Sequence, residues 1–191
     1  KSFLKDFIKN KFKSFGPYQD FIRKGESYMF HSVLSSSINI GLINPIDIIE
    51  EISKVESSIP INSYEGYIRQ LFWREYQLYC YNYIDYKTAL KNPYFDYKNN
   101  LNKSWYDGTT KNELINDTIK KSFDTGYLHH IERLMVIGNY MNLCEIKPEE
   151  GIKWFIEFAI DSYEWVMYQN VYDMVFFVTT KTMRKPYISS D

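Results

Sequence analysis

A run of hydroxyl side chains gives the sequence its first candidate binding site. His31, Ser32, Val33 and Leu34 precede a row of serines, Ser35–Ser37, at the predicted start of a helix. The first N–H groups of a helix lack partners within the helix, and with the helix dipole they favour a bound phosphate. The segment therefore predicts an anion site. The simpler interpretation is a helix cap with polar serines on the surface.

A second cluster combines arginine with large aromatic rings. Residues Arg69–Tyr76 include Gln70, Trp73 and Arg74 on one predicted helix. A buried arginine beside a tryptophan holds a phosphate or stacks on a ring. The same residues also fit a helix with an Arg–Glu surface and an aromatic core stripe.

A third cluster places histidines next to an arginine. His130 and Arg133 are three residues apart and share one helix face. Adjacent helical residues diverge by about 100°, so His129 and His130 are poorly placed to share one metal ion. The alternative is a partly buried histidine bonded to Glu132 or to the backbone.

The fourth cluster is Trp154 with the segment Asp161–Trp165. Its carboxylates are candidate partners for Arg133, and its aromatic rings are either core residues or an electron relay. The sequence has no Ser-His-Asp order, HExxH motif or P-loop, which disfavours hydrolases and nucleoside triphosphatases.

Helical spacing of apolar residues predicts the elements that position these clusters. Gly16-Pro17 is expected to end the first helix, Asn44-Pro45 to start the third, and Pro148 to start the seventh. Ser63 is expected to cap the fourth, and Thr109 or Asn112 to cap the fifth. Residues 161–178 are ambiguous between helix and extended chain, and residues 181–191 form a tail without a visible anchor. The predicted class is all-α. The predicted helices span residues 3–12, 29–42, 46–55, 66–83, 113–123, 128–141 and 148–160, with an irregular loop at 91–110.

Composition limits the possible functions. The chain has 191 residues, 45 % hydrophobic and 25 % charged, which predicts one globular domain over residues 1–191. A net charge of −1 gives no overall attraction to nucleic acid. Cys80 and Cys144 fit no metal spacing and favour a reduced, intracellular protein. No apolar run approaches the ~20 residues of a membrane span, so no membrane association is expected. The first residue is Lys1, not Met, which favours an excised fragment.

Six segments, taken in order along the chain, carry a family resemblance. They are Phe15–Tyr18, Phe30–Ser35, Glu65–Tyr76, Gly126–Tyr140, Ile160–Val166 and Lys185–Ser190. Together they resemble the photolyase/cryptochrome family, and in particular its prokaryotic (6-4) photolyase-like, iron–sulfur branch. The resemblance spans nearly the whole chain. It implies a helical domain that holds FAD and whose ancestral activity is light-driven repair of UV photoproducts in DNA.

The resemblance also implies roles for single residues in binding FAD. Arg133 and Asp161 would form a charge pair beside the flavin ring, since a desolvated arginine needs a carboxylate partner. Arg74 would support the phosphate side, and His130 and Tyr163 would also contact the cofactor. The phosphate segment would consist of Ser32, Val33, Leu34 and Ser35.

Catalytic and substrate-binding roles follow from the same resemblance. His130 matches a histidine that transfers a proton to the photoproduct, a role that suits an imidazole. Trp154 matches an aromatic residue that relays electrons to the photoexcited flavin. Gln70, Trp73 and Tyr187 would face a dinucleotide flipped out of UV-damaged DNA.

The chain departs from the family pattern in several places. Residues 1–191 include no counterpart of the family's N-terminal antenna domain, so we expect that a separate antenna polypeptide is a candidate partner. An iron–sulfur cluster needs four cysteines, expected near Leu114 and after Ser190, so we expect no cluster on residues 1–191. Met167 replaces a glutamate expected beside flavin N5, and a thioether does not transfer protons.

Two further differences concern neighbouring segments. Val178–Lys181 lacks the expected Asp-Gly-Gly, and Phe155 replaces a relay tyrosine. These changes weaken the prediction of repair more than that of flavin binding. The alternatives are a non-repairing, cryptochrome-like flavin photosensor and a structural helical remnant without flavin.

Overall fold

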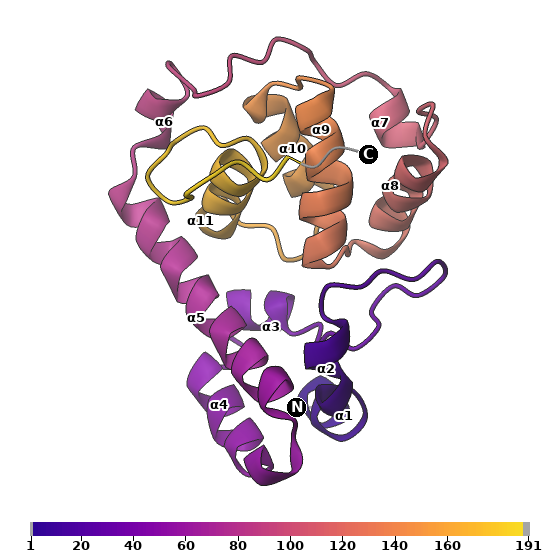
Figure 1. Ribbon diagram of the computed structural model, residues 1–191, viewed down its shortest axis with the longest axis vertical. Coiled ribbons are helices and arrows are strands. Elements are labelled where there is room, and N and C mark those ends of the chain that lie inside the picture. The colour runs from indigo at the N-terminus through magenta and orange to yellow at the C-terminus, as the bar shows by residue number, and fades with distance from the viewer. Residues whose placement is uncertain (1, 189–191) are drawn as a thin grey trace. The chain divides into compact units, whose positions relative to one another are not determined.

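The computed structural model describes residues 2–188 and is helical over 61 % of the chain. It contains no strand within that range, so the predicted all-α class is confirmed (Figure 1). The chain divides into two compact units, Lys1–Tyr76 and Gln77–Asp191, each with its own hydrophobic core. No helix in the described part has the length and apolar character needed to cross a membrane.

Unit 1 is built from short helices around aromatic rings. The ring of Phe7 lies 4.6 Å from Tyr67 and 5.0 Å from Phe12 between centroids, and Ile48 and Ile52 of α4 complete the centre of this core. The last helix, α5, continues into unit 2. The elements are α1 (Ser2–Asp6), the π-helical η1 (Phe7–Lys11), α2 (Phe12–Tyr18), α3 (Ser35–Asn39), α4 (Pro45–Ser53), the 3-10 turn η2 (Glu56–Ser58) and α5 (Ile61–Tyr83).

Gly16 and Pro17 lie inside α2, so the prediction that they end the first helix is wrong. A proline within a helix cannot donate to the carbonyl four residues before it, here that of Lys13. The buried Ser63 hydroxyl donates to the Lys13 carbonyl at 3.1 Å and accepts from the Gly16 N–H at 2.8 Å. Ser63 is therefore a buried link between helices. It is not the helix cap that the sequence predicted, because α5 already begins at Ile61.

We expect Ser63→Ala to lower the free energy of unfolding by about 1–3 kcal/mol, because two partly buried backbone groups lose their partner. Urea unfolding measures this change. Ser57→Ala is the control, since Ser57 is exposed in η2 and should shift stability by less than about 0.5 kcal/mol. Equal effects of the two substitutions would contradict the role assigned to Ser63.

Three helix starts follow from local sequence and are confirmed. The Asn44 side chain accepts a hydrogen bond from the N–H of Ile46, and Pro45 is the first residue of α4. Asn112, one of the two predicted caps, accepts from the N–H of Ile115 at 3.2 Å. Pro148 begins α10. In each case a capping side chain or a preset proline φ angle favours the first turn.

Unit 2 packs its helices around a larger core that contains Trp154, Phe155, Phe158 and Met141. The loop at 91–110 is mostly irregular, as predicted, and contains one short helix. The ambiguous 161–178 segment is helical over most of its length. The elements are α6 (Tyr86–Ala89), α7 (Ser104–Asp107), α8 (Glu113–Thr125), the π-helical η3 (Glu132–Gly138), α9 (Asn139–Leu143), α10 (Pro148–Phe158), α11 (Glu164–Met167) and the π-helical η4 (Tyr168–Val175).

A buried carboxylate anchors the segment that follows η4. Asp173 accepts hydrogen bonds from the Thr179 N–H at 2.9 Å, the Thr179 hydroxyl at 3.0 Å, the Thr182 hydroxyl at 2.6 Å and the Tyr86 hydroxyl at 3.0 Å. Burial raises the pKa of Asp173, while these four donors act in the opposite direction. The prediction of an unanchored tail from residue 181 is therefore wrong at Thr182, which Asp173 holds.

Candidate functional site

The centre of the candidate site is an ion pair between Arg133 and Asp161 in unit 2. The Arg133 guanidinium donates to an Asp161 carboxylate oxygen at 2.9 Å, and its Nε donates to the Leu128 carbonyl at 2.6 Å. The two side chains are only 19 % and 10 % exposed. Partial desolvation strengthens the attraction and fixes the direction of the guanidinium. The structure thus contains the pair that the family resemblance implied.

Two local features bring these residues together. Arg133 lies on the π-helical turn η3, a geometry that is frequent at functional sites. Gly126 ends α8 with φ 64°, and its carbonyl accepts a hydrogen bond from the Ile160 N–H at 3.0 Å. A Cβ on Gly126 would lie 2.6 Å from Ile160 Cγ2. Glycine at this position therefore lets the chain before Asp161 lie against the chain that leads to Arg133.

The donor set of Arg133 fits a cofactor ring that carries hydrogen-bond acceptors. Its bonds to other described residues use two of its five N–H groups, which leaves three for a ligand. The rings of Tyr127 and Phe158 lie 5.9 Å from the guanidinium carbon and form an apolar surround. Flavin carbonyls and ring nitrogens are acceptors of the required kind, so the residues present fit FAD.

The two histidines of this region have different surroundings. His129 is buried, and its backbone N–H donates to Glu132 at 3.3 Å. Glu132 also forms an ion pair with Lys121 at 2.5 Å. His130, the predicted proton donor, is exposed. The histidine bonded to Glu132 is therefore His129, and the side chain of His130 is accessible to a substrate.

Trp154 is fully buried in unit 2. Its indole N–H donates to the Trp105 carbonyl at 2.7 Å, and its ring contacts Phe158 with centroids 4.8 Å apart. Phe155, at the position of the expected relay tyrosine, packs edge-on against Trp154 at 5.2 Å. Trp154 is thus a core residue, one of the two interpretations left open by the sequence. Its role as an electron relay stays a prediction, which a core position does not oppose.

Three other residues of unit 2 that the family resemblance singled out differ in their exposure to solvent. Met167 is buried, with 3 % exposure, so its thioether points into the protein at the position where a glutamate was expected. Tyr163 is 39 % exposed, and Tyr187 is half-buried. The last two residues of the matching segment that ends at Ser190 lie outside the described part of the chain.

In unit 1 the predicted phosphate segment has a different local structure from that expected. The helix begins at Ser35 and has only five residues, so the predicted helix at 29–42 is too long at both ends. Val33 instead has φ 55°, a strained angle for a β-branched residue. Such strain is often found at ligand sites. The side chain of Ser32 is hydrogen-bonded to Tyr67, and burial raises the pKa of Tyr67 to about 12.

The arginine cluster of unit 1 lies on α5. Arg74 is 21 % exposed and forms an ion pair with Glu75 at 2.5 Å. Trp73 packs against Tyr76 with ring centroids 5.0 Å apart, and Gln70 is half-buried on the same helix. These contacts match the interpretation of a helix with an Arg–Glu surface. The roles of the three predicted residues toward phosphate or DNA stay predictions.

Sequence reasoning missed Asp173, which organises the segment after η4. Its acid side chain stands among apolar neighbours at Val171, Tyr172 and Val175. The available signal was a run of apolar residues that contains one carboxylate and is followed by several threonines. A buried carboxylate requires hydrogen-bond donors, and threonine hydroxyls supply them.

Comparisons with known proteins place the chain in context. No model of a known protein family matches it. It is 32 % identical over 198 residues to a (6-4) photolyase from Agrobacterium fabrum (strain C58 / ATCC 33970), an alignment that covers 99 % of this chain. The chain spans 37 % of the length of that relative.

Two proteins of Acanthamoeba polyphaga mimivirus are also similar. Uncharacterized protein R853 is 41 % identical over 113 residues, covering 57 % of this chain and 85 % of its own length. Uncharacterized protein R855 is 53 % identical over 57 residues, covering 29 % of this chain and 46 % of its own length.

Among solved structures, a bacterial class III photolyase from Agrobacterium tumefaciens has the same fold. The TM-score is 0.75 at 19 % identity, over 93 % of this chain and 38 % of that protein. The sequence match to a (6-4) photolyase over 99 % of this chain, together with this shared fold, leads to one conclusion: the chain belongs to the photolyase/cryptochrome family.

Proposed function

We propose that the chain is an FAD-binding, photolyase-like domain, and that its ancestral reaction is light-driven repair of UV photoproducts in DNA. The observation that carries this proposal is the partly buried Arg133–Asp161 pair, with three guanidinium N–H groups open to a ligand. A bound flavin would supply light absorption and electron transfer. The family relationship supports the choice of FAD over other acceptor-bearing cofactors.

The residues of the chain would divide the work between binding and proton transfer. Asp161 holds the Arg133 guanidinium in place through the 2.9 Å bond, so its remaining donors keep a fixed direction toward the cofactor. His130 is exposed and would exchange a proton with the DNA photoproduct. We expect Ser32–Ser35, with Arg74, to contact the cofactor phosphates, and Gln70, Trp73 and Tyr187 to contact DNA.

A repair assay tests the catalytic part of this proposal. Protein reconstituted with FAD is mixed with an oligonucleotide that contains one (6-4) photoproduct, and the sample is exposed to blue light. Repair predicts that the photoproduct disappears in the light and persists in a dark control. No loss of photoproduct by a protein that retains flavin would contradict repair.

One observation favours a second function, that of a non-repairing flavin photosensor. Met167 is buried and carries a thioether at the position where the family pattern has a glutamate. A thioether is neither a proton donor nor a strong acceptor. Met167→Glu tests this reading: a sensor that lost repair through this change should gain photoproduct turnover, while flavin content stays constant.

A further inference from the structure

We propose that Tyr94 and the loop Phe177–Pro186 form a second binding site in unit 2, for a small ligand that carries a phosphate group and an aromatic ring. A mononucleotide is the simplest molecule of this kind. The site uses none of the residues assigned to FAD or DNA, so the proposal does not depend on flavin binding.

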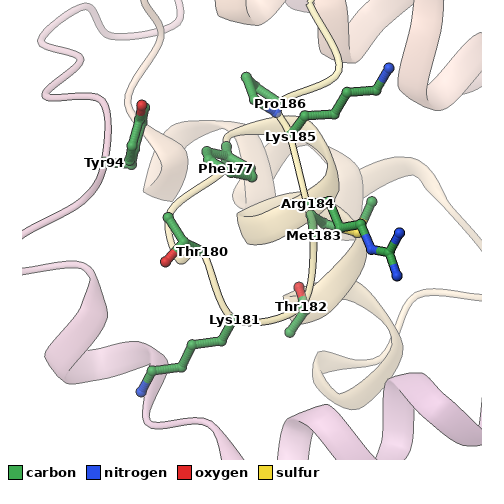
Figure 2. A pocket seen from close by; sticks show the side chains of 9 residues that line it. All are labelled: Tyr94, Phe177, Thr180, Lys181, Thr182, Met183, Arg184, Lys185 and Pro186. Atoms are coloured by element: carbon green, nitrogen blue, oxygen red, sulfur yellow. The ribbon is translucent and has the colours of Figure 1, made fainter.

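The loop lines an open hollow whose volume is that of a small-ligand pocket. Its volume is 570 Å³, within the roughly 300–1,000 Å³ common for ligand pockets. The chain runs outward from Phe177 to Lys181 and back from Thr182 to Pro186, with Tyr94 at one side (Figure 2). The lining residues are Tyr94, Phe177, Thr180, Lys181, Thr182, Met183, Arg184, Lys185 and Pro186.

The charge of this lining is entirely positive. Lys181, Arg184 and Lys185 contribute three cations, and no aspartate or glutamate lines the hollow. Within residues 2–188, none of the three forms an ion pair. This concentration contrasts with the net charge of −1 for the whole chain. A local positive potential of this kind attracts phosphate, and the planar guanidinium binds it through paired hydrogen bonds.

The three cationic side chains start from the loop that lines the hollow, and their charged ends extend away from it (Figure 2). Figure 2 shows the side chains of Lys181, Arg184 and Lys185 extending in three different directions from the loop, not along one line. A straight nucleic-acid backbone would engage cations arranged in a row. Cations that start from different sides of one hollow suit a compact anion when their long flexible side chains turn toward it. The arrangement therefore favours a small ligand.

An aromatic surface is available for the ring of the ligand. Tyr94 is 61 % exposed, and its ring stands edge-on to Phe177 with centroids 5.1 Å apart. The Tyr94 N–H donates to the Val178 carbonyl at 3.3 Å, which ties this ring to the loop. Exposed tyrosine offers a flat apolar face for stacking. Phe177 has φ 50°, a strained angle of the kind that marks functional loops.

Two buried residues of η4 hold the loop in shape. Asp173 accepts hydrogen bonds from both Thr179 and Thr182, which lie on the outgoing and returning parts of the loop. The buried Gln169 amide also contacts the Met183 sulfur at 3.6 Å. Asp173 is not a lining residue, and its carboxylate already accepts hydrogen bonds from Thr179, Thr182 and Tyr86. A preformed loop reduces the entropy cost of binding a ligand.

Isothermal titration of the intact chain with guanosine 5′-monophosphate tests the proposal. This probe is neither the adenine half of FAD nor a pyrimidine photoproduct. We expect it to bind, and guanosine and inorganic phosphate to bind more weakly by about tenfold or more, because each lacks one of the two recognised groups. We expect the K181A/R184A/K185A variant to lose affinity for the nucleotide by about tenfold or more, with FAD content unchanged.

The matched control is K87A/K91A/K111A, which removes three exposed lysines of unit 2 outside the pocket. It should bind the nucleotide like the unmodified chain. Equal losses in both variants would show an effect of overall charge and overturn the site. The proposal is also overturned if the folded chain does not bind the nucleotide. It is equally overturned if K181A/R184A/K185A weakens the binding of a single-stranded oligonucleotide but not of the nucleotide, since the three residues would then contact a nucleic-acid backbone.

Discussion

Asp161→Ala is expected to lower the free energy of unfolding by about 3 kcal/mol, because breaking a buried ion pair leaves an uncompensated charge. The expected value is at the low end for buried pairs, since the Arg133 side chain keeps 19 % exposure to water. We also expect the variant to lose bound FAD, because the guanidinium loses the partner that sets its direction. Urea unfolding and the flavin absorption of purified protein measure the two effects.

Asp124→Ala is the control for this substitution. Asp124 is an exposed carboxylate of α8 in the same unit, and its removal should change stability by less than about 0.5 kcal/mol. Asp161→Asn keeps the shape and one acceptor oxygen but removes the charge. An Asp161→Ala protein that melts and retains flavin like the unmodified chain would contradict the assignment of the pair.

Trp154→Ala should cost about 4 kcal/mol, since truncation of a fully buried aromatic residue leaves a large cavity. The indole contacts Phe158 and Phe155 and donates to the Trp105 carbonyl, so packing and a buried hydrogen bond are lost together. Trp154→Phe should cost less, because it keeps a ring and loses mainly the hydrogen bond. Thermal and urea unfolding measure both.

The phenylalanine variant also separates the structural role of Trp154 from a relay role. If Trp154 carries electrons, Trp154→Phe should bind FAD normally and reduce it more slowly under blue light. Ile156 lies on the same helix and is 41 % exposed. Ile156→Ala is therefore the control and should leave stability and photoreduction nearly unchanged. Trp154→Ala with the stability of the control would mean that the core is wrongly described.

The sequence predicted those parts of the fold that depend on neighbouring residues. Asn44 with Pro45, Asn112 and Pro148 each begin a helix as expected, because a cap or a proline acts within one turn. The all-α class follows from the same short-range periodicity.

Features that depend on distant residues could not be predicted in this way. Pro17 leaves the Lys13 carbonyl without its usual helical donor, and Ser63, 46 positions after Pro17 in the chain, donates to that carbonyl. The anchor of the 179–182 segment is Asp173, whose donors come from two separate elements. The π-helical turn at Arg133 has no recognisable local pattern.

The candidate site was accessible from sequence only through the family resemblance. Physical reasoning required a carboxylate for a desolvated arginine, and both Asp161 and Glu164 were available to Arg133. In the structure Asp161 forms the pair, whereas Glu164 accepts a hydrogen bond from the Tyr81 hydroxyl at 3.2 Å. Spacing along the chain does not distinguish the two acids, because a turn after α10 decides which one points inward.

The most direct test of the account is an equilibrium titration of the purified, flavin-free chain with FAD, followed by flavin fluorescence. The account predicts saturable, stoichiometric binding that shifts the absorption of the flavin and disappears in Asp161→Ala. A chain that is folded by circular dichroism, yet leaves FAD free throughout the titration, would contradict it.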